Sequence, residues 1–106
     1  MHTIIETPMF AADADDLWTE EERGLFYAWL AANPKAGDPI PGSGGCRKVR
    51  WTLPGTGKRG GARVIYFVRS KNQTLWLLMV YAKSVRGSIP AHLLKQIREA
   101  LDHEQE

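Results

Sequence analysis

The sequence has little cysteine and no long apolar run. Its single cysteine, Cys46, excludes the internal disulfide framework that stabilises small secreted domains. The longest apolar run, 75–82, is far shorter than the roughly 20 residues that a membrane-spanning helix needs. The start of the chain carries neither the basic nor the apolar segment of a secretion signal. We therefore expect a cytoplasmic protein without a membrane partner.

Carboxylates are also missing, over most of the chain. The segment from Pro39 to Arg98 contains no Asp or Glu but twelve Lys and Arg, whereas the flanking segments 1–38 and 99–106 carry net charges of −6 and −4. The net charge of +2 hides this asymmetry. The acidic ends could neutralise the basic block within the molecule. We favour a polyanionic partner, because so long a block of one sign repels itself without one.

The length of 106 residues and the apolar fraction of 43% indicate one ordinary globular domain, 1–106. Hydrophobic spacing and capping signals predict a short edge strand at 2–6 and helices at 9–18, 19–33 and from Pro90 onward. Alternation predicts strands at 47–53, 62–69 and 74–83, the last two joined by a turn at 70–73. The Pro- and Gly-rich connection 35–45 predicts no regular structure. The expected fold is α+β, an antiparallel sheet with the N-terminal helices and the C-terminal helix packed on one face.

Basic side chains converge on one part of this predicted sheet. Alternation places Lys48 and Arg50 on the face opposite Val49. Arg63 begins the next strand and Lys83 ends the one after, so an antiparallel hairpin brings them together. Tyr81 shares the face of Lys83 and could stack on a base, or it could be an aromatic residue at the edge of the core.

Few chemistries suit this cluster. The histidines (His2, His92 and His103) are scattered and Cys46 stands alone, so we expect no metal and no cofactor. The segment 55–59 departs from a nucleotide-binding P-loop, because Arg59 follows Lys58 where Ser or Thr is needed. RNA supplies its own nucleophile, the 2′-hydroxyl, and arginines can stabilise the charged transition state. A lysine crowded by like charges gives up its proton more readily, so Lys48 is the candidate base.

Three segments together resemble a known family. The patterns NP-x-x-G at 33–37, GxGG-x-RK-x-R at 42–50 and GKRGG-x-R-x-IY at 57–66 resemble the RelE/ParE superfamily of type II toxins, and within it the HigB-like RelE toxins. The resemblance covers essentially the whole chain. It implies a compact fold like that of microbial ribonucleases. It also implies a metal-independent endoribonuclease that cuts mRNA on the 70S ribosome and is neutralised by a cognate antitoxin.

The resemblance also assigns roles to residues. Lys48 and Arg50 match the paired basic residues of the RelE site, Arg63 the phosphate-binding arginine, and Lys83 the basic end of the last strand. Ser84 follows Lys83 where RelE has an arginine, which Arg86 could replace, and no tyrosine follows Tyr81. The residues assigned to contacts with RNA or the ribosome are Arg47, Lys58, Arg59, Tyr81 and Arg86.

Two other functions stay open on the same fold. One is a ParE-like inhibitor of DNA gyrase, and the other is a non-catalytic RNA-binding module. The segment 42–50 favours the mRNA endonuclease. For HigB-like toxins the resemblance implies a HigA-like antitoxin with a helix-turn-helix DNA-binding domain.

Overall fold

The structure of the chain is a computed structural model that describes residues 2–52, 61–82 and 89–104. Within these ranges, three helices and five strands form in the order β1-α1-α2-β2-β3-β4-β5-α3, with a short 3₁₀ turn between β4 and β5. No helix in the described ranges is long and apolar enough to cross a membrane. The strand bounds are β1 Thr3–Glu6, β2 Asp38–Pro39, β3 Cys46–Trp51, β4 Ala62–Arg69 and β5 Thr74–Ala82.

The two N-terminal helices begin at threonine caps. Helix α1 (Pro8–Leu17) is capped by Thr7, whose hydroxyl accepts from the Phe10 amide at 3.2 Å and donates to the Leu77 carbonyl at 2.9 Å. Helix α2 (Glu20–Ala32) begins with the predicted capping box between Thr19 and Glu22. Both helices were predicted to within a residue or two at their ends.

The sheet is mixed, in the order β1-β5-β4-β3-β2. Strands β3, β4 and β5 pair antiparallel as predicted, with β4 and β5 in the interior of the sheet, but β1 pairs parallel to β5. The prediction of no regular structure in 35–45 was wrong at Asp38–Pro39, which pairs with Arg47 and Lys48. The turn at 70–73 is a 3₁₀ turn, Ser70–Asn72, followed by Gln73 in the left-handed region.

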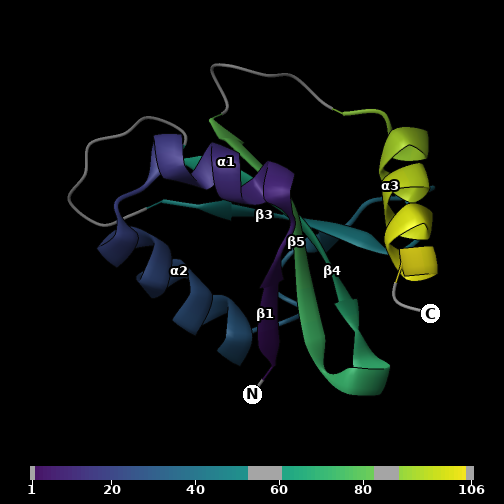
Figure 1. The fold of residues 1–106 in the computed structure, drawn as a ribbon, viewed down its shortest axis with the longest axis horizontal. Helices are drawn as coiled ribbons and strands as arrows, with labels where there is room; N and C mark the ends of the chain where they lie inside the picture. Colours follow the sequence, from purple (N-terminus) through teal and green to yellow (C-terminus); the bar gives the residue numbers. More distant parts are fainter. Residues whose placement is uncertain (1, 53–60, 83–88, 105–106) are drawn as a thin grey trace.

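Helices cover both faces of the sheet, so the prediction that all of them pack on one face was wrong. Alternate residues of β4 enter two separate cores: Val64 and Tyr66 pack with α1 and α2, whereas Ile65 and Phe67 pack with Leu94 of α3. Helix α3 spans Ala91–Glu104. In Figure 1, α2 lies at the left of the view and α3 at the right, and α1 overlaps the upper part of the strands. Helical periodicity shows which side of a helix is buried but does not say which face of the sheet buries it.

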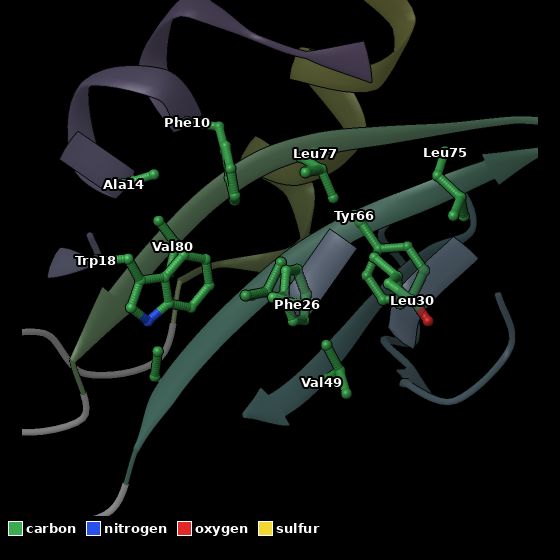
Figure 2. Close-up of a cluster of buried hydrophobic side chains, with 12 residues drawn as sticks. Phe10, Ala14, Trp18, Phe26, Leu30, Val49, Tyr66, Leu75, Leu77 and Val80 are labelled. Carbon is green, nitrogen blue, oxygen red and sulfur yellow. The ribbon is translucent and has the colours of Figure 1, made fainter. Parts of the chain in front are cut away.

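The core under α1 and α2 is aromatic. Phe26 is fully buried, with its ring centre 5.2 Å from that of Trp18 and 5.4 Å from that of Trp51. Figure 2 shows Phe26 and Leu30 of α2 beside Val49 and Tyr66 of the sheet. This core holds β3 from the side opposite Lys48 and Arg50.

Candidate nucleic-acid interface

Three predicted site residues lie in a single row across the sheet. Arg50 of β3 is directly opposite Arg63 of β4, and Arg63 is directly opposite Tyr81 of β5. Directly opposed residues point to the same face, so this row lies on the face that α3 also occupies. Lys48, two residues before Arg50, shares the face and is paired with Ile65. The three basic side chains on this face, Lys48, Arg50 and Arg63, are called the basic row.

The basic row places like charges on neighbouring strands. Arg50 is exposed, whereas Lys48 and Arg63 are half-buried. Like charges directly opposite each other across a strand pair are destabilising in the free protein. Guanidinium groups bind phosphate oxygens with two parallel hydrogen bonds, and an ammonium group adds a point charge. The arrangement can therefore hold a phosphate and stabilise negative charge that develops on it.

The sequence leaves two roles open for Tyr81, stacking on a base or packing at the edge of the core. It lies in line with Arg50 and Arg63, yet its side chain is only 7% exposed and belongs to the core cluster with Ile65 and Met79. The ring therefore forms part of the apolar packing next to the basic row. Its assignment to RNA contact stays a prediction.

Arg47 does not join the basic row. It is paired with Tyr66 and so faces the α2 side of the sheet. Its Nη1 atom donates to the Gly37 carbonyl at 2.7 Å and to the Lys35 carbonyl at 3.3 Å. In this structure Arg47 ties the connection after α2 to β3.

The hydroxyl group of Tyr66 binds the same connection, residues 34–37. Its buried hydroxyl donates to the Pro34 carbonyl at 2.9 Å and accepts from the Gly37 amide at 2.9 Å. Burial raises the pKa of the Tyr66 phenol, and the Gly37 amide and Arg47 oppose that rise. A Cβ atom on Gly37 would lie 2.9 Å from the Tyr66 ring and 3.0 Å from the Lys48 carbonyl oxygen. The NP-x-x-G pattern therefore has a structural role, as the place where the chain passes closely over β3 and β4.

The GxGG pattern is likewise a turn, the one that leads into β3. Gly42, Gly44 and Gly45 have φ of +76°, +76° and +100°, which side chains disfavour. The Ser43 hydroxyl donates to the Ile40 carbonyl at 2.6 Å and accepts from the Cys46 amide at 3.0 Å. Two of the patterns behind the family resemblance thus shape the backbone that leads into β3 and its basic residues.

Four other predicted site residues lie outside the described ranges: Lys58, Arg59, Lys83 and Arg86. Within the described part of the chain, no three side chains of His, Cys, Asp or Glu come together in a way that could hold a metal ion.

The fold and the basic row together define an α+β domain with a five-stranded mixed sheet, helices on both faces and a cationic patch on β3 and β4. Solved structures place this domain more narrowly, in the fold of the RelE toxins. No protein-family profile matches the sequence.

Three RelE-type structures show the likeness. A free-state double arginine-to-alanine mutant of Escherichia coli RelE has a TM-score of 0.61 at 14% identity, covering 92% of this chain and 96% of that one. The isolated E. coli RelE toxin has a TM-score of 0.59 at 14% identity, covering 97% and 98%. A chain of the RelBE2 toxin–antitoxin complex of Mycobacterium tuberculosis has a TM-score of 0.60 at 17% identity, covering 76% and 96%. The expectation of a RelE-like fold is confirmed.

Proposed function

We propose that this protein is the toxin of a type II toxin–antitoxin system and acts as a ribosome-dependent endonuclease on mRNA. The observation that carries the proposal is the basic row, in which Arg50 and Arg63 are directly opposed and Lys48 lies two residues away on the same face. The RelE fold supports it, as does the lack of carboxylates between Pro39 and Arg98. The single domain 1–106 would carry the whole activity.

The proposed reaction uses lysine, arginine and the hydroxyl of the RNA itself. The 2′-oxygen attacks the adjacent phosphorus, and the bond to the 5′-oxygen breaks, leaving a cyclic phosphate and a 5′-hydroxyl. Lys48 takes the proton of the 2′-hydroxyl, and Lys83 is the candidate donor to the leaving oxygen. Arg50 and Arg63 bind the phosphate oxygens and stabilise the extra charge of the transition state.

The proposed partners are the 70S ribosome, mRNA and a cognate antitoxin. One of the similar structures is a toxin–antitoxin complex, which supports an antitoxin here. A cationic patch on the sheet would be neutralised by acidic or covering segments of such a partner. The HigB-like subtype and a helix-turn-helix antitoxin of the HigA type stay predictions.

The test is the mapping of mRNA ends on purified, programmed ribosomes with the wild type, Lys48→Ala and Arg63→Ala. Lys71→Ala is the matched control, because Lys71 is an exposed lysine in the turn between β4 and β5, away from the basic row. We expect cleavage by the wild type and the control, and loss of about 10²-fold or more in the two site variants. Intact mRNA with the wild type would contradict the proposal. Inhibited gyrase supercoiling with intact mRNA would instead support the ParE-like function.

A further inference from the structure

Arg98 of α3 reaches the turn that leads into β3. The carbon of its guanidinium lies 4.6 Å from the centre of the Phe67 ring, and its Nη1 atom donates to the Gly44 carbonyl. Its Nε atom lies 4.0 Å from Oδ2 of Asp102, one helical turn further on. Three contacts therefore hold a side chain that is only 25% exposed.

The turn has the shape that this guanidinium requires. A Cβ atom on Gly45 would overlap Nη1 of Arg98, and a Cβ atom on Gly44 would lie 3.9 Å from its Cδ atom. Both glycines also have positive φ. Gly45 thus leaves the space that the Arg98 guanidinium fills, whereas Gly44 is needed for its positive φ.

The same turn sets where β3 begins. The Ser43 hydroxyl accepts from the Cys46 amide, and Cys46 is paired with Phe67, the residue whose ring Arg98 covers. Cys46 shares its face with Lys48 and Arg50, which follow it by two and four residues. Arg98 therefore contacts both the turn before the first residue of β3 and the ring opposite that residue.

A second arginine strengthens the docking of α3. Arg69 forms an ion pair with Asp102 and lies 5.4 Å from the ring centre of Trp76. The rings of Phe67 and Trp76 are stacked, 5.9 Å apart and 3° from parallel. Asp102 thus lies between two guanidinium groups that each cover one of the stacked rings.

We propose that Arg98 is a positioning residue, which couples the docking of α3 to the position of Lys48 and Arg50. Its effect on cleavage rests on the proposed function. Its effect on the start of β3 does not. Removal of the guanidinium frees the turn at Gly44 and Gly45, loosens α3, and lets the strand that carries two members of the basic row shift.

The first measurement is the rate at which a thiol reagent labels Cys46 in the native protein. Cys46 is the chain's only cysteine, is fully buried, and lies in the same core cluster as Leu94 of α3. Because Cys46 is fully buried, a reagent reaches its thiol only when this cluster opens, and burial also raises the pKa of the thiol. We expect Arg98→Ala to label roughly tenfold faster than the wild type, given what a cation–π contact and a hydrogen bond contribute. Arg98→Lys should lie between them, and Gln96→Ala, at an exposed position of the same helix, should match the wild type.

The second measurement separates positioning from mere stability. Cleavage on ribosomes is measured per folded molecule, at a temperature where circular dichroism shows each variant fully folded. We expect kcat of Arg98→Ala to fall roughly tenfold with KM changed less than about twofold, because misplaced groups fail in the transition state more than in binding. The amide resonances of Lys48 and Arg50 should shift in the NMR spectrum of this variant and not in that of Gln96→Ala.

The outcomes are distinct. Faster labelling together with shifted Lys48 and Arg50 resonances supports the coupling even if the wild type fails to cut mRNA, in which case only the proposed function falls. Labelling of Arg98→Ala at the wild-type rate would overturn the inference. So would faster labelling with unmoved resonances, since Arg98 would then hold α3 without positioning β3.

Discussion

The two faces of the sheet differ in how much of each serves packing. On the α1/α2 face, Phe10, Trp18, Phe26 and Tyr66 form a closed aromatic core, and Arg47 is bonded to backbone carbonyls. On the α3 face, one end of β3 and β4 is packed through Cys46, Phe67 and Leu94. The other end carries the basic row. One face thus supplies rigidity, and the other combines a smaller core with charged side chains that a strand pair alone disfavours.

Neighbouring residues of one strand therefore have different roles, because they face opposite sides of the sheet. Along β3, Arg47 and Val49 face the aromatic core, and Lys48 and Arg50 face away from it. Substitutions on the α1/α2 face should therefore change the free energy of unfolding and spare the chemistry. Substitutions in the basic row should do the reverse.

The largest effect is expected from Phe26→Ala. Phe26 is fully buried among Trp18, Trp29 and Trp51, so its loss leaves a large cavity and should cost about 3–5 kcal/mol in the free energy of unfolding. Urea denaturation measures this cost. Cleavage per folded molecule should stay at the wild-type level, and a loss of cleavage in the folded variant would break the comparison between the two faces.

The next effect compares two arginines on opposite faces of β3. Arg50→Ala should lower cleavage by about 10²–10³-fold, as for the loss of one donor to a developing oxyanion, and leave stability unchanged or slightly higher because Arg63 loses a like-charged neighbour. Arg47→Ala should cost about 1–2 kcal/mol of stability through its lost bonds to Gly37 and Lys35, with cleavage retained. Cleavage assays and urea denaturation of both variants test the pair. If Arg47→Ala lost cleavage and kept its stability, Arg47 would be an RNA contact after all.

A smaller effect is expected from Tyr66→Phe. Loss of the hydroxyl leaves the buried Gly37 amide without its partner and should cost about 1–3 kcal/mol at neutral pH. Burial raises the pKa of Tyr66 above its ordinary value of 10.0, so the stability due to the neutral phenol is present below pH 10 and is lost as the pH rises through the higher folded value. The stability difference between wild type and variant should therefore shrink in urea titrations above pH 10. A difference that grows with pH would contradict the raised pKa.

The smallest effect is expected from Thr19→Ala, which removes the capping box of α2. The threonine hydroxyl accepts from the Glu22 amide at 3.1 Å, and its loss should cost about 1 kcal/mol. Thermal unfolding of Thr19→Ala beside Thr19→Ser, which keeps the cap, isolates this contribution. Equal melting temperatures for the two variants would show that the cap is not what holds α2.

Much of the fold follows from local patterns in the sequence. The capping box at Thr19, the alternation along β3 and the apolar runs of β4 and β5 predicted those elements closely. The two-residue strand Asp38–Pro39 escaped, because its pairing depends on β3 and its proline has no amide hydrogen to give. The parallel pairing of β1 and the face chosen by α3 also escaped, because both depend on contacts between distant parts of the chain.

For the candidate site, too, local patterns were predictive and distant contacts were not. Alternation and the hairpin together predicted that Lys48, Arg50 and Arg63 share a face, and the observed register brings them together. Arg47 had the same charge and motif as its neighbours, and only its place in the alternation distinguishes it. Arg98 and Gly44 are 54 positions apart in the sequence, so no local sequence pattern predicts their contact. The glycines at 44 and 45 were the one local sign that something lies close to that turn.

The parallel pairing of β1 with β5 has a consequence for the time at which the fold is completed. Thr3 is paired with Thr74 and Glu6 with Leu77, and the cap of α1 is bonded to the Leu77 carbonyl, 70 residues away. Contacts so distant along the chain are late to form, because a long loop must close first. During synthesis, β1 and the cap of α1 cannot form these contacts until β5, which leaves the ribosome much later, is available. We therefore expect the nascent chain to stay without its finished sheet, and α1 without the bond of its cap to the sheet, until β5 has emerged.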